Sequence, residues 1–130
     1  MASIIQRKAQ RAVKRGSEKV TVEDLKKVAD RAAVIEEKFK PGGPLGRFNS
    51  DATLLLSLIC DFEKDTCCDI AWSSIAAIVF AFAYVLDPLD IIPDFRPWIG
   101  YEDDAIIVAA CLALIEQDLE KYIEWKKQNC

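Results

Sequence analysis

The fold is decided by residues 70–86, which read IAWSSIAAIVFAFAYVL and contain no charged side chain. At helical spacing the large side chains fall on one side of this segment and the small ones on another, so neighbouring helices can pack on both sides. The large set is Trp72, Ile75, Val79, Phe82 and Leu86, and the small set is Ser74, Ala77 and Ala81. This pattern predicts a central helix that is buried on all sides, with Trp72 in the core.

A transmembrane helix is the alternative for this segment. Its seventeen residues lie at the lower limit of the roughly 17–25 that a spanning helix needs. The next uncharged run, residues 105–115, is shorter, and a very acidic turn separates the two. We therefore favour a buried core helix that does not span a membrane.

The spacing of apolar residues elsewhere predicts further helices over residues 3–15, 21–39, 50–64 and 102–127. The predicted fold class is all-α, a single-domain bundle of about five helices. Residues 70–86 and 102–127 form its central antiparallel pair of apolar helices, which a Pro/Asp-rich turn joins. The whole chain, residues 1–130, is expected to be one helical domain.

Several helix ends can be predicted from capping residues. Gly16 is a candidate C-cap for the first helix, and Thr21 with Asp24 forms a weak capping-box signal for the second. Asn49 or Ser50 is expected to cap the helix that follows the Pro41–Pro44 loop.

Charge is distributed unevenly along the chain, although the net charge is only −4. Residues 1–20 carry six basic side chains and one acid, whereas residues 41–130 carry six basic and fifteen acidic side chains. An acidic body repels the phosphates of nucleic acids, so we expect no nucleic-acid partner. Only the N-terminal segment can attract an anionic partner.

The basic N-terminal helix, within residues 1–16, supplies the candidate contacts to such a partner. These are Arg7, Lys8, Arg11, Lys14 and Arg15. The apolar face of this helix is thin, and membrane affinity scales with apolar area plus charge. We expect the helix to pack on its own domain, with peripheral membrane contact secondary.

Histidine is absent from the chain, which excludes Ser-His-Asp and Cys-His catalysis and histidine-containing zinc sites. The five cysteines form no CxxC motif, and a reducing cytoplasm with thiols as small core residues is the simplest interpretation. We expect no catalytic residue, no cofactor and no bound metal. Neither the protein partner nor the oligomeric state can be deduced from the sequence.

The turn between the two apolar helices, within residues 84–105, reads YVLDPLDIIPDFRPWIGYEDDA. It closely resembles the signature of the YkvA-like family, also called domain-of-unknown-function family 1232. The positions that match the family pattern are Pro88, Asp90, Ile92, Pro93, Asp94, Pro97, Gly100, Asp103 and Asp104. Asp87, Arg96 and Glu102 depart from it by placing charge on the turn.

Looser similarity to the family extends over residues 30–125. The resemblance implies a small helical domain, often in bacterial proteins and sometimes linked with membranes. It implies no reaction, because none is established for the family.

The turn is also the candidate functional segment, through Asp87, Asp90, Asp94, Trp98, Glu102, Asp103 and Asp104. We expect Asp90 and Asp94 to accept hydrogen bonds from nearby backbone N–H groups, as capping groups do. The alternative is that the carboxylates converge on a hard cation such as Mg²⁺ or Ca²⁺. Trp98 is a candidate anchor for a partner.

These observations favour a non-enzymatic interaction module that binds a protein partner or a membrane surface. One alternative is a metal-dependent enzyme that uses the turn carboxylates. A second is an acidic inhibitor of the antitoxin or immunity type, which masks a basic active site by charge complementarity.

Overall fold

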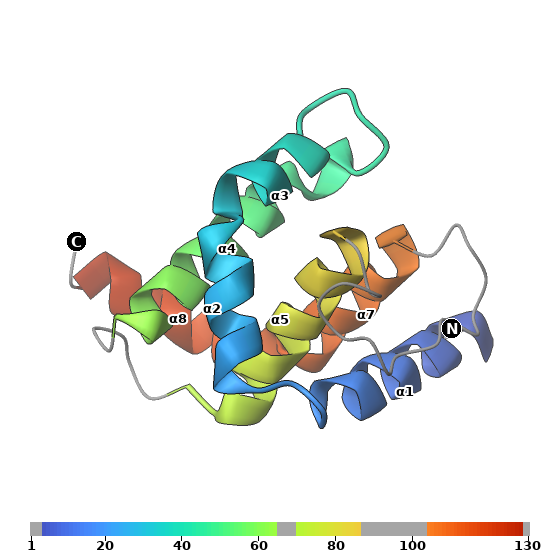
Figure 1. Ribbon diagram of the computed structural model, residues 1–130, viewed down its shortest axis with the longest axis horizontal. Coiled ribbons are helices and arrows are strands. Elements are labelled where there is room, and N and C mark those ends of the chain that lie inside the picture. The colour runs from blue at the N-terminus through green and yellow to red at the C-terminus, as the bar shows by residue number, and fades with distance from the viewer. Residues whose placement is uncertain (1–3, 65–69, 87–103, 129–130) are drawn as a thin grey trace.

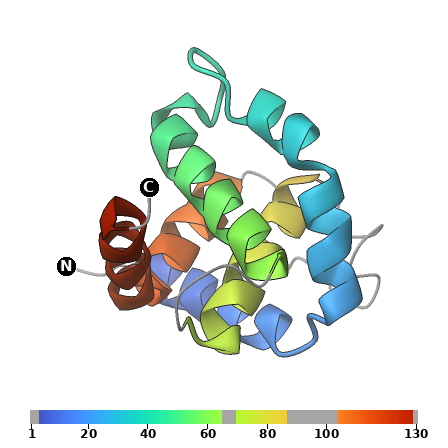
Figure 2. The ribbon, with the colours of Figure 1, turned by 90° about the vertical axis from the view of Figure 1, so that its left-hand side faces the viewer.

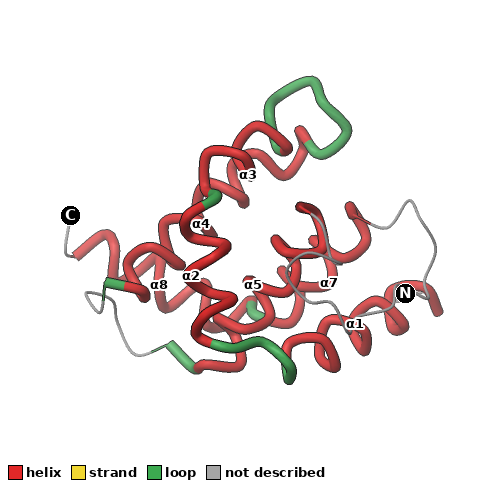
Figure 3. The backbone as a smooth tube through the Cα atoms, viewed as in Figure 1, coloured by secondary structure: helices red, strands yellow, loops and turns green. Residues whose placement is uncertain are grey.

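The computed structural model describes residues 4–64, 70–86 and 104–128 of the chain. These residues form an all-α fold without strands, as the sequence predicts (Figures 1 and 3). The helices are α1 (Ile4–Ser17), α2 (Val22–Asp30), α3 (Ala32–Lys38), the 3₁₀ turn η1 (Gly46–Phe48), α4 (Asn49–Glu63), α5 (Trp72–Leu86), α7 (Asp104–Leu114) and α8 (Glu116–Gln128).

Helix α5 is the centre of the molecule. Every residue from Ser74 to Val85 is buried, and α1, α2, α3, α4 and α7 all pack against this helix. Helices α5 and α7 run side by side in opposite directions (Figure 1). The two-sided pattern of large and small residues therefore predicted the central helix correctly. Within the described ranges, no helix has both the length and the apolar character needed to cross a membrane.

Two of the expected helices are each divided in two. The segment 21–39 breaks at Arg31, whose N–H bonds to the Val28 carbonyl oxygen at 3.0 Å in a tight final turn. The bend lets both Ile35 and Phe39 reach the core, where Phe39 meets the ring of Phe82 edge-on at 5.9 Å between centroids. No glycine or proline marks this break.

The last helix, expected over 102–127, breaks at Ile115 into α7 and α8. The side chains of α7 after Asp104 are uncharged, whereas α8 opens with Glu116 and Asp118 in its first turn. Acids are favoured at a helix N-terminus by the macrodipole, so the change of composition coincides with a new helix start. Figure 2 shows where α8 lies after the break, with α8 on one side of α4 and α2 on the other.

Helix α1 packs its small apolar face on α5 and α7. Ala9, Ala12 and Val13 are buried there, and Gly16 faces the ring of Phe80. A Cβ atom at position 16 would lie 2.0 Å from the Phe80 Cε1 atom. The expectation that Gly16 is a C-cap is therefore wrong, because the helix continues to Ser17 and Gly16 serves close packing instead.

The remaining predictions, for helix ends and for Trp72, have mixed outcomes. Thr21 and Asp24 form the complete capping box, with Thr21 N–H donating to Asp24 Oδ2 at 2.9 Å and Asp24 N–H donating to Thr21 Oγ1 at 3.2 Å. Neither Asn49 nor Ser50 caps α4, since the Asn49 side-chain amide instead donates to the Phe39 carbonyl oxygen at 3.0 Å. Trp72 is 39% exposed and lies against Phe62, so its expected place in the core is wrong.

Candidate functional site

The basic candidates from the sequence all lie on the outer face of α1. Arg7, Lys8, Arg11, Lys14 and Arg15 are exposed, and residues 4–17 include no acid. They project outward because the opposite face of the helix is buried on α5 and α7. That face carries Ala9, Ala12, Val13 and Gly16, which recur at helical spacing. The docked helix therefore presents a continuous positive face, which we call the basic face.

Helix stability does not account for the basic face. The macrodipole favours cations only at a helix C-terminus, where Lys14 and Arg15 stand. Arg7 lies in the first turn, where a positive charge is disfavoured. Within the described ranges the ion pairs are Lys40–Glu37, Lys121–Asp118 and Lys126–Asp61, and none of them involves α1. The helix is thus attached to its domain by apolar packing, and its charges remain available at the surface.

Most of the candidate turn lies outside the described residues. This applies to Asp87, Asp90, Asp94, Trp98, Glu102 and Asp103. Asp104 is described and stands half-buried in the first turn of α7, where the helix dipole favours a carboxylate. Among the described side chains, no cluster of three or more carboxylates or thiols could hold a metal ion. The capping and metal hypotheses for the turn both stay predictions.

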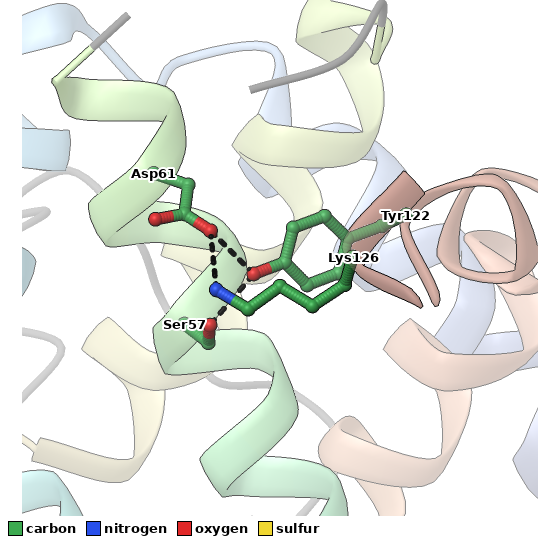
Figure 4. Close-up of polar contacts among 4 residues, drawn as sticks. All are labelled: Ser57, Asp61, Tyr122 and Lys126. Carbon is green, nitrogen blue, oxygen red and sulfur yellow. Dashed lines mark hydrogen bonds and ion pairs between the residues drawn. The ribbon is translucent and has the colours of Figure 1, made fainter. Parts of the chain in front are cut away.

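A polar network between α4 and α8 was not anticipated from the sequence (Figure 4). The Tyr122 hydroxyl donates to Asp61 Oδ2 at 2.6 Å, and the Lys126 ammonium donates to the same oxygen at 3.1 Å. Ser57 Oγ lies 2.6 Å from the Tyr122 hydroxyl oxygen and donates to it, because the tyrosine proton is directed at Asp61. The ring of Tyr122 is fully buried and stacks on Trp125.

The electrostatics of this network hold Asp61 and Lys126 charged and Tyr122 neutral. Burial acts to raise the pKa of Asp61, but hydrogen bonds from Tyr122 and Lys126 outweigh it, and the pKa lies below its ordinary value. Burial, followed by the hydrogen bond to Asp61, raises the pKa of Tyr122. The hydrogen bond to Asp61 is the main cause that raises the pKa of Lys126.

This network fastens α8 to α4 across the break at Ile115. Both pairs, Ser57 with Asp61 and Tyr122 with Lys126, have the i,i+4 spacing that places side chains on one helix face. That spacing is visible in the sequence, but which two helices meet is not. A second bond between Ser74 Oγ and Asp118 Oδ2, at 2.6 Å, joins α8 to α5.

The thiols show no reactive arrangement in the described part of the chain. Cys60 is half-buried and Cys111 is fully buried, and neither is in a disulfide. Burial raises the pKa of the Cys111 thiol to about 12, so it stays protonated at neutral pH. These two cysteines behave as the sequence predicts, as small residues in or near the core.

Comparison with known proteins identifies the segment around α5 and α7. Residues 74–110 match the family model DUF1232, described as a protein of unknown function. The chain is also 40% identical over 48 residues to a protein of Bacillus subtilis (strain 168) named "Uncharacterized membrane protein YkvA". The matched segment is therefore similar to this family, and the resemblance expected from the signature is confirmed.

The similarity is local. The stretch aligned with the Bacillus protein is 37% of this chain and 45% of that protein. The range that matches the family model, residues 74–110, includes the whole signature at 84–105. No solved structure matches the chain. The N-terminal helix and its basic face precede the family-model match, so they are features of this chain beyond the matched segment.

Proposed function

We propose that this chain is a non-enzymatic module that docks on an anionic membrane surface through the basic face of α1. The main observation that supports it is the arrangement of that helix. Five exposed cations stand on one face, while the other face is buried in the domain. The charges are thereby held on a fixed outer surface of a folded domain.

The expected strength of this contact follows from membrane electrostatics. Each Lys or Arg near an anionic leaflet contributes about 1 kcal/mol, and the attraction falls off within a Debye length of about 8 Å at physiological salt. Five such residues supply enough attraction for reversible binding. Because the apolar face of α1 is buried, docking is electrostatic and does not need the helix to insert.

The rest of the chain favours one orientation on such a surface. Residues 41–130 carry nine more acids than bases, so the anionic leaflet repels the body while it attracts the basic face. The same acidity disfavours a nucleic acid as the anionic partner. The name of the Bacillus relative, a membrane protein, supports a membrane over a protein partner. A reducing compartment is the simplest interpretation of the cysteines in the sequence, and the cytoplasmic leaflet is anionic, so the proposed contact is on the cytoplasmic side.

The two alternatives have less support. A carboxylate-based metal enzyme would depend on the turn carboxylates within residues 87–104, and an acidic inhibitor would depend on overall acidity alone. No observation on the described residues favours either.

Flotation of the full chain with vesicles tests the proposal. We expect binding to vesicles of phosphatidylglycerol and phosphatidylcholine, loss of binding on pure phosphatidylcholine, and weakening as salt is raised. The triple variant Arg7→Gln, Arg11→Gln, Lys14→Gln should lose most of this binding. The matched control is Lys26→Gln, Lys27→Gln, Lys38→Gln, which removes three exposed charges from α2 and α3. Equal loss in both variants, or no binding of the unaltered chain, would overturn the proposal.

A further inference from the structure

A groove runs between α1, α7 and η1, next to the basic face. It has a volume of about 430 Å³ and an apolar floor that includes Ala105, Ala109 and Ala113, one turn apart on α7. Gln6 and Gln10 line it from α1, and Arg47 lines it from η1. Helices α1 and α7 lie side by side (Figure 1).

The floor of the groove is apolar and partly open to solvent. Ala109 and Ala113 are exposed, and α7 carries no charge after Asp104. Asp104 itself lines a neighbouring hollow against α3 and the loop at 43–45, which adjoins the groove at Ala105. Among the described residues, the groove lining therefore contains no acidic side chain.

Cations stand along both rims of this apolar floor. On the α1 side Gln10 is three residues after Arg7 and four before Lys14, so both cations neighbour it on the helix surface. On the other side the guanidinium of exposed Arg47 lies 4.7 Å from the centre of the Phe48 ring. A molecule with an apolar chain and an anionic head has the complementary pattern.

We propose that this groove takes an acyl chain of an anionic phospholipid, with the headgroup phosphate between Arg47 and the basic face. The inference rests on the proposed function, because it names what the docked domain holds at that surface. A second copy of the chain is the less favourable occupant. An isologous pairing brings the same two rims together, and their cations repel each other.

The test uses the full chain labelled with ¹³C at the alanine methyl groups. The probes are dihexanoyl phosphatidylglycerol below its micelle concentration, dihexanoyl phosphatidylcholine, and glycerol phosphate. We expect saturable shifts of the Ala109 and Ala113 methyl signals with the anionic lipid and weaker ones with the zwitterionic lipid. The headgroup alone should leave these methyls unmoved, and the exposed Ala33 methyl on α3 serves as the internal reference.

Two variants sharpen the result. Ala109→Glu places a charge on the apolar floor and should weaken lipid binding at least about tenfold, because the carboxylate would have to be desolvated. Ala33→Glu is the matched control and should bind normally. Arg47→Gln should lose the preference for the anionic lipid and keep the chain contact.

The outcomes separate this inference from the proposed function. Alanine methyls that do not respond to lipid, in a chain that floats on anionic vesicles, would overturn the groove assignment and leave the basic face intact. A lipid-free dimer that Ala109→Glu dissociates would overturn it in favour of a second copy. A chain that fails to float, but whose Ala109 and Ala113 methyls respond to the soluble lipid, would overturn surface docking alone.

Discussion

Gly16 shows how one missing side chain positions a whole helix. It lets α1 approach Phe80 on α5, where even a Cβ atom would overlap the ring. An exposed helical Gly→Ala change stabilises a helix by about 1 kcal/mol. Here we expect Gly16→Ala to destabilise the protein by about 1–3 kcal/mol instead, because the added methyl overpacks a buried contact.

Urea unfolding of Gly16→Ala, Phe80→Leu and the double variant measures this effect. If the ring is the obstacle, the smaller leucine side chain should recover part of the loss in the double variant. Greater stability of Gly16→Ala than of the unaltered chain would show that α1 does not sit as closely as the structure has it.

Tyr122 is the shared member of the network between α4 and α8. Tyr122→Phe removes the hydroxyl that bonds Asp61 and Ser57, and we expect a loss of about 1–3 kcal/mol. The folded pKa of Asp61 is depressed, so its contribution is present above the ordinary carboxyl pKa and disappears as pH falls through the folded value. In Tyr122→Phe the free energy of unfolding should therefore fall less steeply as the pH is lowered into the acid range.

Urea unfolding at pH values between 7 and 3 tests this second effect. The control is Glu63→Gln, which alters an exposed carboxylate on α4, the helix that carries Asp61. A variant with Tyr122→Phe that loses stability in acid as steeply as the unaltered chain would contradict the role assigned to this hydroxyl.

At the scale of elements, the sequence predicted the centre of the fold better than its edges. Helix α5 was predictable because residues 70–86 contain no charge and place large and small side chains on different sides at helical spacing. The breaks at Arg31 and Ile115 were not, since neither carries a glycine or proline and both depend on how a helix must bend to cover the core. The basic face was predictable from charge, whereas the Ser57–Tyr122–Asp61–Lys126 network required knowing that α4 meets α8.

The turn between α5 and α7 carries its own prediction from the sequence. Asp90→Ala and Asp94→Ala should each destabilise the protein by about 0.5–2 kcal/mol, the loss associated with a removed helix cap. Thermal unfolding with and without millimolar Mg²⁺ or Ca²⁺ should give the same melting temperature. A metal-dependent rise that both variants abolish would favour a cation site, since a ligand that binds only the folded state raises its stability.

At the scale of the whole molecule, the packing role of α1 can be separated from the surface role that we propose for it. Its inner face covers α5 and α7 through Ala9, Ala12, Val13 and Gly16, and its outer face carries the cations. Deleting residues 1–16 removes both faces at once. Because the deletion uncovers part of the core, including Phe80, we expect a less cooperative and aggregation-prone protein.

The triple variant Arg7→Gln, Arg11→Gln, Lys14→Gln removes only the outer role. All three side chains are exposed, so its stability should change by no more than about 0.5 kcal/mol while vesicle binding is lost. Removing clustered like charges relieves repulsion within the helix, whereas removing Lys14 loses a favourable interaction with the helix dipole, so these two small effects oppose each other. Calorimetry and flotation on the same three proteins compare the two roles directly. If the deletion variant unfolds as cooperatively as the unaltered chain, α1 is not needed to cover the core. If the triple variant unfolds at a clearly lower temperature than the unaltered chain, the cations of α1 stabilise the fold and do not serve a surface contact.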